Sequence, residues 1–158
     1  MWAADDARGD ARAARLAEAR AWMAKLATWA EHCPASFAHK RDLVAAEIAR
    51  IEGDPWSAQE LYERASEGAR AEGLTHAEAL AEDLAGRFHL ARASRRYARL
   101  HLHAAVSAYA RWGATAKVDA MRREHGELLA EVDLALSDAQ ARVARGSSAS
   151  QPGRHSTR

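Results

Sequence analysis

Residues 75–91, THAEALAEDLAGRFHLA, carry the clearest structural signal in the chain and decide the interpretation of the rest. Thr75 and Glu78 have the spacing of a capping box, in which each side chain accepts a hydrogen bond from a backbone N–H at a helix start. The apolar residues that follow recur every three or four positions, the spacing of one helix face. They are Ala77, Leu80, Ala81, Leu84, Phe88 and Ala91. We therefore predict a helix that begins at Thr75 and buries this stripe.

Similar patterns on both sides of this segment predict further helices with short breaks between them. Asp54 followed by Pro55 is typical of a helix start, because Asp caps free backbone N–H groups and proline has none to satisfy. Gly73 and Gly113 are typical of helix ends. The expected helices cover residues 10–32, 37–51, 55–73, 75–91, 94–112 and 115–145, the last bent or broken near His125–Gly126.

The composition indicates an all-α fold. Alanine makes up about a quarter of the 158 residues, whereas Leu, Ile, Val and Phe together number only 23. Sheets favour β-branched and aromatic residues, so a large sheet is disfavoured. Alanine is the best helix former and lets neighbouring helices approach closely. We therefore expect thin helices that pack through alanine.

A shift of 40 residues aligns the chain with itself. It places Ile48 on Phe88, Ala58 on Ala98, Tyr62 on Leu102 and Ala65 on Ala105. Small residues at close helix crossings, with bulky residues beside them, are what helix–turn–helix repeats require. We predict antiparallel helix pairs stacked as a short tetratricopeptide-like right-handed solenoid. This domain should cover residues 1–145, with its core at 22–118, and precede a disordered tail at 146–158.

Several functional classes are disfavoured by missing features. The single cysteine, Cys33, cannot form an intramolecular disulfide or a multi-cysteine metal site. No apolar run approaches the ~20 residues of a membrane span, and the N-terminus lacks the apolar stretch of a secretory signal. Phosphate-binding loops, dinucleotide-binding loops and hydrolase or metalloprotease motifs are absent. We expect a cytoplasmic protein that is not an enzyme, with no catalytic residue, cofactor, metal site or membrane contact.

Charge divides the chain into two halves of opposite sign. Residues 47–86 hold ten acidic and three basic residues, and residues 87–125 hold nine basic and two acidic residues. The two halves could attract each other across their interface or present solvated faces. Alternatively, the basic half could meet an acidic partner domain. Self-association is also possible, because a helical array without polar caps leaves apolar end faces exposed.

Six residues are candidates for partner binding: Arg92, Arg95, Arg96, Arg99, Trp56 and Trp112. The four arginines cluster at the start of the helix expected at 94–112, where an anion could also be attracted by the helix N-terminus. An anion- or nucleic-acid-binding protein is therefore the alternative function, although a sequence pI of about 8.0 argues against nucleic acid. The two tryptophans could anchor a peptide on the concave face of a solenoid, or simply pack between repeats.

Short strings within residues 22–118 resemble a known protein family. The strings are Trp29-Ala30, Cys33-Pro34, Phe37, His39-Lys40, Leu43-Val44, Ala46-Glu47, Leu61-Tyr62-x-x-Ala65, Glu78-Ala79-Leu80-Ala81, Phe88-His89-Leu90-Ala91 and Tyr109-x-x-Trp112-Gly113-Ala114-x-x-Lys117-Val118. They resemble the tetratricopeptide-like helical region of very large bacterial multi-sensor signalling kinases. In that family a serine/threonine kinase-like domain and an AAA-type predicted ATPase precede this region, and a GAF sensor and a histidine kinase follow it.

The resemblance implies a connector that relays or scaffolds signals and holds kinase, ATPase or GAF sensor domains. It transfers no catalytic residue, because the ATP-binding and phosphorylation sites of that family lie in its other domains. The chain could be a fragment of such a two-component kinase or a free-standing remnant. It departs from the family pattern at Ser36 and at Ala93, where the family usually has a glycine. Ala93 leaves one expected turn without the residue that most easily adopts positive φ.

Overall fold

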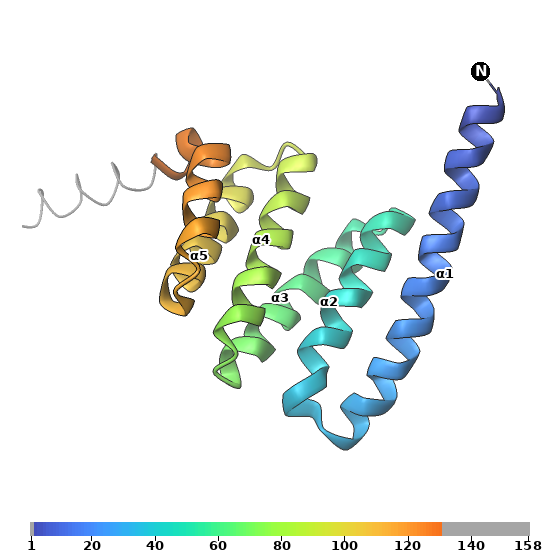
Figure 1. Ribbon diagram of the computed structural model, residues 1–158, viewed down its shortest axis with the longest axis horizontal. Helices are drawn as coiled ribbons and strands as arrows, with labels where there is room; N and C mark the ends of the chain where they lie inside the picture. The colour runs from blue at the N-terminus through green and yellow to red at the C-terminus, as the bar shows by residue number, and fades with distance from the viewer. Residues whose placement is uncertain (1, 131–158) are drawn as a thin grey trace, which may run out of the picture.

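The computed structural model describes residues 2–130 of the chain. Within these residues all regular structure is α-helical, which confirms the all-α prediction (Figure 1). The helices are α1 (Trp2–His32), α2 (Pro34–Glu52), α3 (Pro55–Ala71), α4 (Thr75–Ala91), α5 (Arg95–Trp112) and a sixth helix over residues 115–130. The expected helical segment 131–145 and the expected tail at 146–158 lie outside the described residues.

Helices that follow each other in the chain pack as antiparallel neighbours, because only one to three residues connect them (Figure 1). Contacts also join α2 to α4, whereas α3 and α5 do not contact each other. The helices therefore form two layers. One layer contains α2, α4 and the helix over 115–130, and the other contains α3 and α5 (Figure 1).

The turns between these helices recur every 20 residues. Gly53, Gly73, Ala93 and Gly113 have φ angles of +86°, +68°, +57° and +86°. After each of them, the next backbone N–H donates to the carbonyl five residues earlier, at 2.9 Å. This hydrogen bond is typical of the Schellman motif, which needs a left-handed residue at the helix end. Three of the four turns use glycine, and Ala93 adopts the same conformation with a Cβ.

Helix starts agree with the sequence prediction at one position and differ at another. Asp54 caps α3 as predicted, and its carboxylate accepts a hydrogen bond from the Ser57 backbone N–H at 3.1 Å. The predicted capping box of α4 is wrong. The N-cap residue is Leu74, no side chain caps the helix, and Glu78 accepts hydrogen bonds from two arginines instead.

The two ends of the described chain also differ from the prediction. Helix α1 begins at Trp2, earlier than expected, and the helix over 115–130 passes through His125 and Gly126 without a break. Arginine side chains of α1 reach the next hairpin, where Arg12 donates to the Ile51 carbonyl and Arg20 to Glu52. In the described part of the chain, no helix has the length and apolar character needed to cross a membrane.

Alanine lines the contacts between helices, and bulky residues fill the space beside it. The triplets Ala58, Tyr62, Ala65 and Ala98, Leu102, Ala105 are at most 1% exposed, so both copies of the repeated pattern are buried. Tyr62 belongs to a core cluster shared by α2, α3 and α4. Leu102 belongs to a second cluster shared by α4, α5 and the helix over 115–130, which extends to Leu129.

Candidate functional site

An open groove of about 850 Å³ runs along the outward face of α5. At the end of α5 it reaches two side chains of other helices, Arg70 at the end of α3 and Glu78 at the start of α4. The α5 side chains that give it its character are Arg96, Tyr97, Arg99, Leu100, His103 and Arg111. We call this feature the basic groove, because its lining contains four arginines and a single acidic residue.

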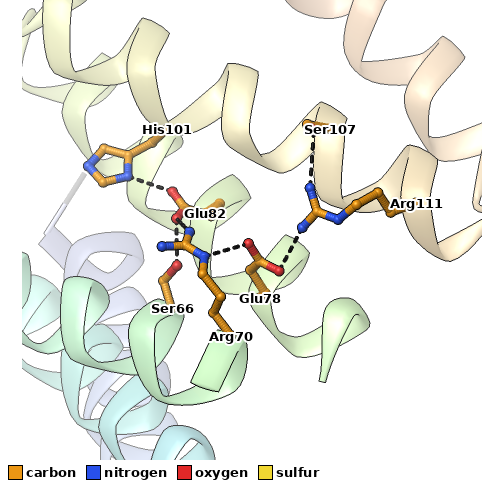
Figure 2. Close-up of polar contacts among 7 residues, drawn as sticks. All are labelled: Ser66, Arg70, Glu78, Glu82, His101, Ser107 and Arg111. Atoms are coloured by element: carbon orange, nitrogen blue, oxygen red, sulfur yellow. Dashed lines mark hydrogen bonds and ion pairs between the residues drawn. The ribbon is translucent and has the colours of Figure 1, made fainter. Parts of the chain in front are cut away.

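Glu78 ties together the helices that form the end of the basic groove. Its side chain is only 6% exposed. Arg70 Nε donates to one carboxylate oxygen at 2.9 Å, and Arg111 Nη2 donates to the other at 2.8 Å (Figure 2). The two arginines come from α3 and α5, which do not contact each other, so this buried carboxylate joins them across α4. Charge-assisted hydrogen bonds of this kind are the stronger ones in proteins.

Glu82 lies one turn further along α4 and is the centre of a second polar cluster. Its carboxylate accepts hydrogen bonds from His101 Nδ1 at 2.8 Å, from Arg70 Nη2 at 3.1 Å and from the Ser66 hydroxyl (Figure 2). Burial by itself would raise the pKa of Glu82. The hydrogen bonds from His101 and Ser66, with the charges of His101 and Arg70, outweigh burial and lower the pKa below its ordinary value. Glu82 is therefore a buried carboxylate at neutral pH.

An aromatic stack connects this cluster to the surface. The rings of His101 and His89 are parallel within 6° and 5.2 Å apart, and Tyr97 stacks on the other side of His89 at 5.4 Å. Burial lowers the pKa of His89, and the charges of His101 and Arg92 lower it further. His89 is thus neutral near pH 7 and acts as an aromatic spacer between Glu82 and the half-exposed Tyr97.

The chemistry available in this site is ionic and apolar contact. All four carboxylate oxygens of Glu78 and Glu82 already accept hydrogen bonds, so neither residue presents a free oxygen to the basic groove. Over the part of the chain that the structure describes, no three His, Cys, Asp or Glu side chains gather in a metal-binding arrangement. Leu100 is 65% exposed and Tyr97 51% exposed. The groove therefore combines positive charge with an apolar strip.

The structure separates the four arginines that the sequence groups together. Arg96 and Arg99 line the basic groove. Arg92 follows α4 rather than belonging to α5, and its guanidinium lies 5.6 Å from the centre of the Phe88 ring. Arg95 lines a different pocket, beside the helix over 115–130. Adjacent residues on a helix point about 100° apart, so a cluster in sequence need not form a cluster on the surface.

The two candidate tryptophans lie far from each other. Trp56 is 81% exposed at the start of α3, whereas Trp112 is 56% exposed at the end of α5 and contacts the His76 ring at 5.7 Å. Because α3 and α5 run in the same direction, the start of one and the end of the other lie at opposite edges of the molecule. The two tryptophans cannot anchor the same short peptide together.

Sequence reasoning missed the residues that hold the site together, Arg70, Glu78, Glu82 and Arg111. One signal could have revealed Glu78. In the 20-residue register of the turns, Ala58 and Ala98 occupy the equivalent buried positions, so Glu78 is a charged residue where the register is otherwise apolar. A charge at such a position requires buried partners.

Comparison with known protein families, curated proteins and solved structures finds no match for this chain. What the basic groove binds is therefore argued from its own geometry and charge.

Proposed function

We propose that this protein is a non-catalytic helical-repeat interaction module that binds protein partners through the outward face of α5. In this proposal the stacked pairs are a short tetratricopeptide-like right-handed solenoid, as the 40-residue repeat predicts. The observation that carries the proposal is the basic groove itself. It is open, positively charged and partly apolar, and Glu78 holds its end in place through Arg70 and Arg111.

A rigid groove favours binding of a partner over chemistry on a small molecule. Each conformation that is already fixed before binding lowers the entropic cost of association. Arginine and tyrosine are enriched among the residues that dominate binding energy at interfaces. A reaction centre would instead need a free acid, base or nucleophile directed into the groove, and the carboxylates nearest to it are already engaged by other side chains.

The partners we propose are the kinase, ATPase or GAF sensor domains of a bacterial signal-transduction system, and the setting is the cytoplasm. Both follow from the resemblance of residues 22–118 to the helical region of multi-sensor kinases. The alternative, an anion or nucleic-acid binder, has less support. Its four arginines lie on different surfaces, and three exposed glutamates of α3 (Glu60, Glu63 and Glu67) would repel a long polyanion.

A binding assay with the full chain tests this function. The chain is labelled and titrated with purified kinase-like, ATPase and GAF domains encoded next to it, and also with duplex DNA. We expect saturable binding to at least one domain, weakened by at least about tenfold in the variant Arg96→Glu with His103→Glu. The control Arg122→Glu with His32→Glu makes the same change of charge outside the groove and should bind like the wild type.

Other outcomes would overturn the proposal. Binding to DNA alone, lost as salt is raised, would favour the polyanion alternative. ATP hydrolysis or autophosphorylation by the purified chain would show that it is an enzyme. Equal weakening by the groove variant and its control would show that the basic groove is not the binding surface.

A further inference from the structure

The outward side of α3 carries charge opposite to that of the basic groove. Glu60, Glu63 and Glu67 are all exposed and recur at helical spacing, with the exposed Trp56 one turn before them. The neighbouring Arg64 is directed to the other side of the helix, where it pairs with Asp42 of α2 at 3.1 Å. We call Trp56, Glu60, Glu63 and Glu67 the acidic ridge.

The acidic ridge and the basic groove occupy equivalent positions in successive repeats. A shift of 40 residues places Trp56 on Arg96, Glu60 on Leu100, Glu63 on His103 and Glu67 on Ser107. Because α3 and α5 belong to one layer and run in the same direction, both features look outward from the same face (Figure 1). One face of the molecule thus presents a negative row beside a positive row, about one repeat apart.

Such a face is complementary to itself under only one kind of rotation. A two-fold axis parallel to α3 and α5 exchanges the two rows, so each negative row faces a positive row. A two-fold axis across the helices places each row on its own copy, which brings like charges together. Two-fold symmetric contacts are the commonest kind in protein oligomers, because one surface patch then serves both subunits.

We propose that the basic groove takes the acidic ridge of a second copy of this chain, forming a dimer whose two-fold axis runs parallel to α3 and α5. The proposal deepens the proposed function and rests on it, because it names the partner of the same groove. The axis pairs residues with their own repeat equivalents. Trp56 of one copy faces Arg96 of the other, a favourable pairing of an aromatic face with a guanidinium. Glu63 faces His103 in the same way.

This occupant accounts for both rows of charge, whereas other occupants account for one. A polyanion would bind the basic groove but be repelled by Glu60, Glu63 and Glu67. A purely acidic peptide would leave the acidic ridge and the exposed Trp56 without a role. The second copy also covers Leu100 and Tyr97, which removes apolar surface from water. It leaves the internal ion pairs of Glu78 undisturbed.

Charge reversal on one row at a time tests the dimer. The ridge variant is Glu60→Arg with Glu67→Arg, and the groove variant is Arg96→Glu with His103→Glu; each changes two outward positions seven residues apart. Mass is measured by light scattering after size exclusion, and the dimerisation constant by sedimentation equilibrium, at low and high salt. We expect the full wild-type chain to dimerise, with dissociation increasing as salt screens the charges.

Each variant alone should dimerise at least about tenfold more weakly, because its two rows then carry the same sign. An equimolar mixture of the two variants should form a heterodimer, since the positive rows of one face the negative rows of the other. The control Arg122→Glu with His32→Glu should dimerise like the wild type. The mixing result cannot come from misfolding, which would remove association in the mixture as well.

A wild-type chain that stays monomeric, variants that dimerise normally, or a mixture that stays monomeric would each overturn the proposed dimer. If the monomeric chain still binds one of the signalling domains through the basic groove, the proposed function stands and only the identity of this partner is wrong. If it neither dimerises nor binds a domain, both proposals fail.

Discussion

Gly86 in α4 marks the closest approach between α4 and α5, and replacing it with alanine tests that contact. A Cβ added at Gly86 would lie 2.7 Å from both Cγ and Cδ2 of Leu102. Leu102 is completely buried, so its side chain has no free space into which to move. Gly68 in α3 provides a matched control, because a Cβ there would lie at an ordinary 3.6 Å from the Cβ of His39.

The expected magnitudes follow from two opposing effects. Alanine stabilises a helix interior by about 1 kcal/mol relative to glycine, and this gain applies at both positions. Forcing a methyl group into a filled core costs about 1–3 kcal/mol, and this applies only at Gly86. We therefore expect Gly68→Ala to raise the free energy of unfolding by about 1 kcal/mol. Gly86→Ala should leave it unchanged or lower it by up to about 2 kcal/mol.

Urea unfolding followed by far-UV circular dichroism measures these differences. The double variant Gly86→Ala with Leu102→Ala adds a test of the specific contact. Its loss of stability should be smaller than the sum of the two single losses by about 1 kcal/mol, because truncating Leu102 makes room for the new methyl group. If Gly86→Ala stabilises the protein as much as Gly68→Ala, α4 and α5 are not packed as closely as described, and the reasoning is wrong.

Three further substitutions test other features of the fold. Ala93→Gly should raise the free energy of unfolding by about 1 kcal/mol in urea titrations, because glycine adopts φ = +57° without strain; a decrease would contradict the turn geometry. His39 is buried with no hydrogen-bond partner for either ring nitrogen, and burial, with the charge of Lys40, lowers its pKa. The unfolded chain therefore binds more protons below about pH 6.5, so stability should fall from pH 7 to pH 5, and His39→Leu should reduce this fall. Glu82→Gln should lower the free energy of unfolding by about 1–3 kcal/mol, because a charged acceptor of three hydrogen bonds is lost, and no change would show that the cluster is not load-sharing. Because the folded pKa of Glu82 is lowered, its stabilisation should be present at neutral pH and disappear in acid as the pH falls through that pKa.

Features that depend on a few neighbouring residues could be predicted from the sequence. The start of α3 at Asp54 and Pro55, and the turns at Gly73 and Gly113, follow from local backbone preferences. The buried repeats of small and bulky residues follow from the spacing of apolar side chains. The capping box at Thr75 could not be judged in the same way, because Glu78 has partners on two other helices that compete for its carboxylate.

The candidate site shows the same limit. Sequence proximity grouped Arg92, Arg95, Arg96 and Arg99, but only Arg96 and Arg99 line the basic groove. Arg70 and Arg111 are 41 positions apart in the chain and meet at one carboxylate. No local pattern could pair them, since the pairing depends on how α3, α4 and α5 are rotated about their axes.

The amino-acid sequence alone determined the helices, their turns and the 40-residue repeat, because each of these is set by backbone preference and by side-chain periodicity over a few turns. The tertiary structure decided which charges are paired inside and which look outward. Glu78 and Glu82 become internal anchors, while Glu60, Glu63 and Glu67, of the same residue type, form an exposed ridge. The difference arises because burial and pairing depend on the side of the helix that packs against its neighbours, which only the assembled layers define.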